Sequence, residues 1–144
     1  MNFSTYRFTL DLQRHQSQMS IAVSRYDTAV RLCISLTDGG NPYIIEDGCI
    51  AVLWGKKAND SPISHNCIIE SNTRIVYDFN ESTADEPGIV NCQIRLYKDG
   101  NEIITAPKFI IVVDERIVKD EDIDLKSEEF TKDELSSLEN LLIQ

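Results

Sequence analysis

The chain has 144 residues, of which 42% are hydrophobic and 26% are charged, a composition typical of a folded domain rather than of a disordered chain. Its 24 acidic residues outnumber its 14 basic residues, and the net charge of −10 argues against nucleic-acid binding because phosphates attract basic surfaces. Residues 114–144 hold 11 acidic and 4 basic residues, so most of the negative charge lies in the tail.

Alternation of apolar and polar residues dominates the chain up to about residue 113 and predicts β-strands. Turn-forming residues separate the runs, and Asp99-Gly100 favours a type I′ hairpin because both residues tolerate positive φ. We expect an all-β domain over residues 1–117, an antiparallel β-sandwich of eight or nine short strands. The clearest alternating runs are 6–13, 19–24, 30–37, 75–80 and 90–97.

Two segments, 50–54 and 109–113, are apolar on both sides of the expected strand. Such a strand is either covered on both faces or carries an interface on its outer face. Because no core helix is predicted, an outer contact surface is the interpretation of interest. The candidate interface residues are Ile50, Leu53, Ile110 and Val112.

Four aromatic residues form a candidate platform for stacking a sugar ring. Tyr43 and Tyr97 are the strongest candidates because each lies near a loop or on the polar face of a strand, and Trp54 and Phe109 complete the set. For Trp54, packing in the sandwich core beside Val52 is the favoured interpretation. A carbohydrate-binding module that recognises cell-wall saccharide is therefore the alternative function.

The four cysteines contain no CxxC pair, which argues against a zinc site and predicts free thiols in a reducing compartment. Cys92 shares its face with apolar residues and is expected in the core, whereas Cys33 is expected to be half-exposed. The start of the chain has no basic segment followed by an apolar one, which predicts synthesis in a cytosol, with retention there or release by lysis. No apolar run is long enough for membrane insertion.

Catalytic motifs are not found. The two histidines, His15 and His65, lie among polar residues, and no nucleophile elbow, zinc-protease motif or phosphate-binding glycine loop occurs. The acidic run that begins at Asp120 resembles the start of a calcium loop but has Leu125 where glycine is required. We expect a protein that is not an enzyme, with no catalytic, cofactor-binding or metal-binding residues.

The tail changes character after the strands. Residues 118–129 predict an acidic linker, and residues 130–144 predict a helix. Thr131 and Glu134 match a capping box, and Phe130 and Leu135 match a hydrophobic staple, which together mark the first turn of the helix.

The predicted helix carries an apolar seam on one side. Leu135, Leu138 and Leu142 have the spacing of a coiled coil and are the candidate oligomerisation residues, although a helix that folds back on its own sandwich fits equally well. No stop signal follows the seam, so we expect this chain to be the front portion of a longer protein.

Six stretches of the chain, taken together in their order and spacing, form a pattern: 9–12, 27–32, 34–43, 54–57, 88–94 and 104–113. They cover most of residues 6–117, and together they resemble the N-terminal domain of the baseplate upper protein family of siphophages. Where that family has Lys-Pro-Asp-Gly, this chain has Lys57-Ala58-Asn59-Asp60.

The resemblance implies a non-catalytic structural protein of a phage or prophage virion, located in the tail baseplate. It implies that the β domain anchors to the central baseplate and that the following helix leads to the host-recognition components. The partners it implies are other baseplate proteins, together with copies of the same chain, with a trimer favoured in the full-length protein.

Overall fold

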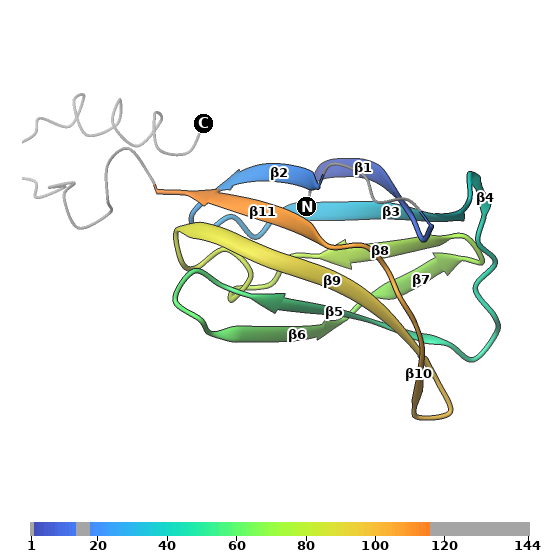
Figure 1. Ribbon diagram of the computed structural model, residues 1–144. Helices are drawn as coiled ribbons and strands as arrows, with labels where there is room; N and C mark the ends of the chain where they lie inside the picture. Colours follow the sequence, from blue (N-terminus) through green and yellow to red (C-terminus); the bar gives the residue numbers. More distant parts are fainter. Residues whose placement is uncertain (1, 14–17, 116–144) are drawn as a thin grey trace, which may run out of the picture.

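The computed structural model describes residues 2–13 and 18–115, which form eleven strands in two sheets that pack face to face (Figure 1). Within these residues no helix is long and apolar enough to cross a membrane. The strands are β1 (Ser4–Asp11), β2 (Met19–Ser24), β3 (Val30–Asp38), β4 (Asn41–Pro42), β5 (Ile50–Lys56), β6 (Pro62–Asn66), β7 (Ile68–Ser71), β8 (Arg74–Asp78), β9 (Gly88–Lys98), β10 (Asn101–Thr105) and β11 (Phe109–Asp114).

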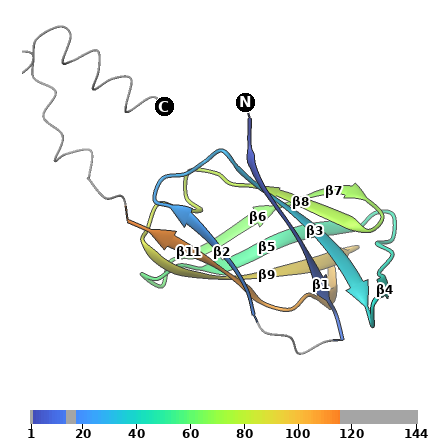
Figure 2. The same ribbon diagram turned by 90° about the horizontal axis from the view of Figure 1, so that it is seen from above.

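One sheet has five strands in the order β1-β3-β8-β7, with β4 paired to β3. The other has six strands in the order β2-β11-β9-β5-β6, with β10 paired to β9. The chain crosses between the sheets after β1, β2, β4, β6 and β8, so the two sheets are interleaved along the sequence (Figure 2). The expected all-β fold of the main domain is confirmed in the described residues.

Both sheets are mixed, so the expectation of an antiparallel sandwich is wrong in two places. β1 pairs with β3 in parallel, and β11 pairs with β2 in parallel. Along the sequence, strands of the opposite sheet lie between the two members of each parallel pair. These intervening strands provide the crossover that a parallel connection requires. Alternation has the same period in both kinds of ladder, so it does not reveal the strand direction.

The expected eight or nine strands also fall short of the eleven found in the described residues. The shortest strands, β4 and β7, have two and four residues, too few for a recognisable alternation.

The core lies between the sheets and consists of the inward rows of alternating residues. The Phe8 and Phe109 rings lie 5.3 Å apart between their centroids and join β1 of one sheet to β11 of the other. The other inward residues are almost all aliphatic, as period-two patterning of both sheets requires. Cys92 is 1% exposed, as expected, whereas Cys33 is 5% exposed, so the expectation of a half-exposed thiol at Cys33 is wrong.

Two turns between strands contain residues with positive φ. Asp99 and Gly100 both have positive φ and link β9 to β10 as a two-residue loop, which confirms the predicted hairpin. Asp60 also has positive φ, at 68°, in the position where the resembled pattern has glycine. The ends of β1 and β3 are joined by Asp11, which is buried at 4% exposure.

The Asp11 carboxylate accepts four hydrogen bonds. The donors are the Gly40 amide at 2.7 Å, the Thr37 hydroxyl at 2.8 Å, the Gln13 amide at 2.9 Å and the Gly39 amide at 3.2 Å. The Gln13 amide, followed by the other donors, holds the pKa of Asp11 well below its usual value despite the cost of desolvation.

The linker predicted for residues 118–129 and the helix predicted for residues 130–144 lie outside the described residues, as do Leu135, Leu138 and Leu142. They remain predictions, together with the boundary at residue 117.

Candidate interaction surface

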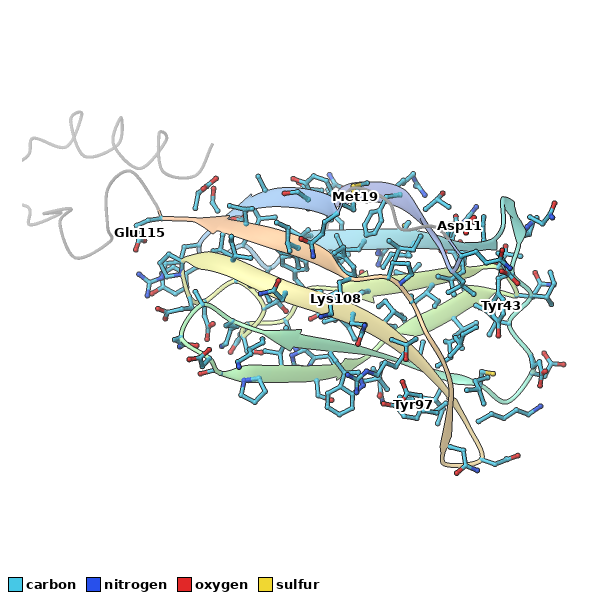
Figure 3. All side chains as sticks on the ribbon, viewed as in Figure 1. Asp11, Met19, Tyr43, Tyr97, Lys108 and Glu115 are labelled. Carbon is cyan, nitrogen blue, oxygen red and sulfur yellow. The ribbon has the colours of Figure 1, made fainter. Side chains whose placement is uncertain are left out.

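The outer face of the six-stranded sheet brings together the two segments that are apolar on both sides. β9 lies between β11 and β5 and pairs antiparallel with each of them. The outward residues of β5 and β11 therefore lie on one surface, separated by the outward residues of β9 (Figure 3). The sequence had suggested these two segments as alternative interfaces, and the fold places them on the same face.

An apolar strip crosses β2, β11 and β9 on this face. The register places Val112 opposite Ala22 on one side and opposite Ile89 on the other. Ile110 is the outward neighbour of Val112 along β11. Ile89 is 48% exposed, Ala22 is exposed, and Ile110 and Val112 are half-buried. We call Ala22, Ile89, Ile110 and Val112 the apolar strip.

Leu53 does not belong to this surface, so the expectation that placed it there is corrected. It is 0% exposed and pairs with Ile94 on the inward side of the sheet. Ile50, by contrast, is 56% exposed and faces outward with Val52 and Trp54. In a run that is apolar throughout, the sequence does not show which alternate residues point inward.

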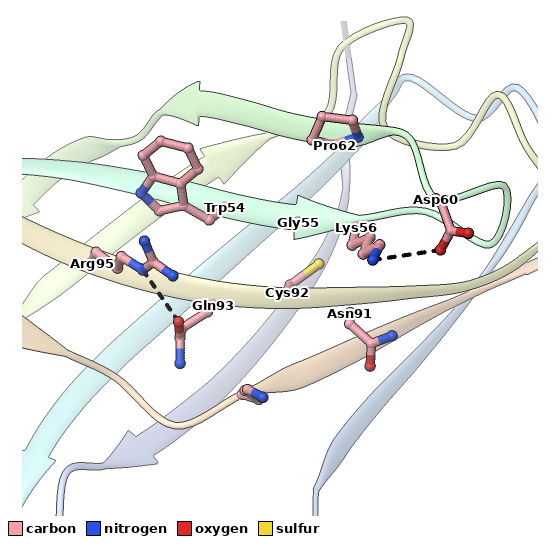
Figure 4. Close-up of a pocket in the computed structure, with 10 residues that line it drawn as sticks. Trp54, Gly55, Lys56, Asp60, Pro62, Asn91, Cys92, Gln93 and Arg95 are labelled. Carbon is pink, nitrogen blue, oxygen red and sulfur yellow. Dashed lines mark hydrogen bonds and ion pairs between the residues drawn. The ribbon is translucent and has the colours of Figure 1, made fainter.

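A groove of about 640 Å³ lies beside Trp54 on the same face (Figure 4). The floor of the groove lies where Gly55 of β5 pairs with Cys92 of β9. Both positions face the inward side of the sheet, so neither places a side chain in the groove. We call it the Trp54 groove, and its lining residues are Trp54, Gly55, Lys56, Asp60, Pro62, Asn91, Cys92, Gln93, Arg95 and Lys108.

The interactions around Trp54 are polar and cationic. Its indole Nε1 donates a hydrogen bond of 2.9 Å to the Tyr97 hydroxyl. The Arg95 guanidinium lies over the indole, 5.2 Å from the ring centroid, and its Nε donates to Gln93 Oε1 at 3.2 Å. The interpretation that Trp54 packs in the core beside Val52 is wrong, because both residues face outward and are half-buried.

Only two of the four candidate aromatics meet. Tyr97 joins Trp54, but Phe109 is fully buried in the core. Tyr43 lies beside β4, at the five-stranded sheet, where its amide donates to the Leu36 carbonyl (Figure 3). Burial raises the pKa of Tyr43, consistent with a phenol packed against the core. An aromatic pair is therefore present, without Tyr43.

Cys92 and His65 belong to the six-stranded sheet but lie on its inward side, beneath this face. Burial raises the pKa of the Cys92 thiol to about 12, so the thiol stays protonated at neutral pH and is a poor nucleophile. The His65 ring forms hydrogen bonds with Ser82 Oγ at 3.2 Å and with Asn80 Nδ2 at 3.0 Å, and burial followed by the nearby Lys57 lowers its pKa. His15 lies outside the described residues. Within the described residues no group of carboxylate, thiol and imidazole side chains has the geometry of a metal site.

Comparison with known proteins supplies the family. The profile of the BppU N-terminal domain matches residues 4–140. Among solved structures, the N-terminal domain of phage TP901-1 ORF48 is similar, with a TM-score of 0.58 and 13% sequence identity over 76% of this chain and 98% of that domain. At that identity the likeness shows the fold. No curated protein sequence matches the chain significantly.

Proposed function

The chain belongs to the BppU N-terminal domain family, the baseplate upper proteins of phage tails, and from that membership we propose that it anchors a phage tail component to the central baseplate. It acts without catalysis and links the baseplate to host-recognition components. The observation that supports this proposal is the family match over residues 4–140, which extends through the sandwich and most of the tail.

The apolar strip supports this proposal because it gives the sandwich a surface suited to a protein partner. Three branched aliphatic side chains, those of Ile89, Ile110 and Val112, point outward from neighbouring strands, with Ile89 48% exposed. Contiguous exposed apolar patches mark interaction sites, protein contacts among them. Other baseplate proteins are the partners that we assign to it, and the virion tail baseplate is the location.

The experiment is coexpression of the chain with the tail proteins encoded beside it, followed by copurification. We expect Ile89→Asp with Val112→Asp to abolish a complex that the unchanged chain forms, because two charges in a buried interface are strongly unfavourable. Thr9→Asp with Ser35→Asp, outward positions on the five-stranded sheet, is the matched control and should leave the complex intact. Equal loss in both variants would contradict the assignment of the surface.

Oligomerisation through Leu135, Leu138 and Leu142 is the second part of the proposal. In the full-length protein, Leu138→Asp with Leu142→Asp should lower the mass measured by light scattering, because a coiled-coil seam does not accept charges. Ser137→Asp with Asn140→Asp adds the same charge beside the seam and should leave the mass unchanged. The same mass in both variants would remove the helix as the assembly element.

Carbohydrate binding is the second candidate function, and the hydrogen-bonded Trp54–Tyr97 pair beside the groove is the observation that favours it. Aromatic rings next to amide and guanidinium groups suit a saccharide, although Arg95 already lies over the indole. Binding on a glycan array should be lost in Tyr97→Ala and kept in Tyr43→Ala. Binding that neither substitution changes, or no binding by the unchanged chain, would refute this candidate.

A further inference from the structure

The Trp54 groove carries an excess of positive charge in an otherwise acidic protein. Lys56, Arg95 and Lys108 line it, against the single carboxylate of Asp60. The chain as a whole has a net charge of −10. We propose that the groove binds the acidic run of this chain's own tail, residues 120–124, which contains Asp120, Glu121, Asp122 and Asp124.

The cations of the groove have weak partners within the described residues. Lys56 Nζ lies 3.6 Å from Asp60 Oδ1, and the two side chains are 64% and 86% exposed. Arg95 Nε lies 3.9 Å from Glu102 Oε1, at the limit of an ion pair. Lys108 is exposed and has no carboxylate partner in the described part of the chain. An additional run of carboxylates is therefore electrostatically favourable here.

The length of the chain allows the run to reach the groove. Lys108 precedes Asp114 by six residues, which is about 20 Å along an extended strand. Asp122 and Asp124 follow Asp114 by eight and ten residues, a reach of roughly 26–36 Å. The segment between Asp114 and the acidic run is therefore long enough for the run to reach the groove.

Attachment to the same chain favours this occupant over a separate acidic molecule. A segment tethered by a short linker has an effective concentration in the millimolar range, so even weak ion pairs hold it in place. The docked run covers Trp54 and part of the apolar strip. The inference stands on the groove and the tail and does not require the baseplate role.

Trp54 is the single tryptophan of the chain and reports on the groove directly. The experiment is acrylamide quenching of its fluorescence in the full 144-residue chain. Since one exposed ion pair shifts an equilibrium by about 1.4- to 5-fold, the loss of pairs with the three cations should shift docking by about tenfold. Asp120→Asn, Glu121→Gln, Asp122→Asn and Asp124→Asn together should therefore raise the quenching constant about twofold at low salt. In about 1 M NaCl the difference should vanish, because the screening length falls to about 3 Å.

The matched control removes four acidic charges elsewhere in the tail. Glu128→Gln, Glu129→Gln, Asp133→Asn and Glu139→Gln should leave the quenching constant unchanged. A rise equal to that of the 120–124 variant would mean that overall charge, not this run, protects Trp54, and would overturn the proposal.

A charge exchange tests the pairing itself. Lys56→Glu with Lys108→Glu should raise quenching, and adding Asp120→Lys with Asp122→Lys should restore protection. Both lysines are exposed, so folding is expected to persist, and circular dichroism checks it. No restoration would contradict docking in this groove. Protection that disappears on dilution from about 100 µM to about 1 µM would assign the run to a second copy and overturn docking within one chain.

Discussion

The outer faces of the two sheets differ in what their outward residues carry. On the five-stranded sheet, Arg31 and Asp78 form a two-pronged ion pair, with Nε–Oδ1 at 2.6 Å and Nη2–Oδ2 at 3.0 Å. Arg74 pairs with Glu70 at 2.9 Å on the same sheet. The six-stranded sheet instead presents the apolar strip and the Trp54 groove. The five-stranded sheet pairs these two arginines closely with carboxylates, although its outward Ile68 is 59% exposed. The cations of the six-stranded sheet have longer ion pairs, of 3.6 Å at Lys56 and 3.9 Å at Arg95.

The difference teaches that alternation alone does not identify an interaction surface. Both sheets alternate inward apolar residues with outward ones, and only the composition of the outward rows separates them. Cys33 and Val76 are apolar outward residues of the five-stranded sheet, yet both are buried beside long neighbours such as Arg7 and Ile68. Coverage by cross-strand neighbours therefore decides whether an outward apolar residue is available.

The largest expected effect on stability comes from shortening a core side chain on the inward side of the six-stranded sheet. Leu53→Ala should lower the free energy of unfolding by about 2–5 kcal/mol, because it leaves a cavity between the sheets. Ile50→Ala, three residues earlier on the outer face, should change it by less than about 0.5 kcal/mol. Urea unfolding measures both. A large loss at Ile50 would show that the outer face takes part in folding.

A smaller effect is expected at Asp11, at the edge of the five-stranded sheet. Because its folded pKa is depressed, its contribution to stability is complete above the ordinary carboxyl pKa of 3.8 and is lost as the pH falls below that value. Asp11→Asn should therefore lower the melting temperature at pH 7 and flatten its decline below pH 4. Thermal melts between pH 2 and pH 7 test this. An unchanged acid profile would mean that other carboxylates dominate.

The smallest expected effect separates the two outer faces themselves. Asp78→Asn should lower the melting temperature slightly, by less in high salt, because an exposed ion pair is weak and screened. Ile89→Thr on the outer face of the six-stranded sheet should leave the melting temperature within experimental error while reducing binding of a hydrophobic dye. Scanning calorimetry and dye fluorescence measure the two effects. Equal destabilisation would remove the distinction between the faces.

Much of the fold follows from the sequence because inward rows repeat every second residue. The hairpin at Asp99-Gly100 also follows, since the positive φ of both residues is encoded locally. The directions of β1 and β2 do not follow, because a parallel and an antiparallel neighbour need the same alternation. In segment 50–54 the phase is set by the register with β9, in which Leu53 faces inward opposite Ile94.

The candidate surface was predictable as two apolar segments, but their union on one face was not. It depends on β9 lying between β5 and β11, a long-range pairing that leaves no local signal. The position of Trp54 was misjudged for the same reason, since an indole suits a core as well as a surface. Its outward placement follows once Leu53 is fixed inside, because successive strand residues point to opposite faces.

The parallel pairing of β2 with β11 has a consequence for how the protein is made. Met19 finds its partner, Phe109, only when the final strand of the sandwich has been synthesised. Until that strand leaves the ribosome, β2 has no ladder to join and the six-stranded sheet lacks its edge. Contacts between such distant parts of a chain form slowly. During synthesis, the six-stranded sheet is therefore completed late, because β2 stays unpaired until β11 has been made.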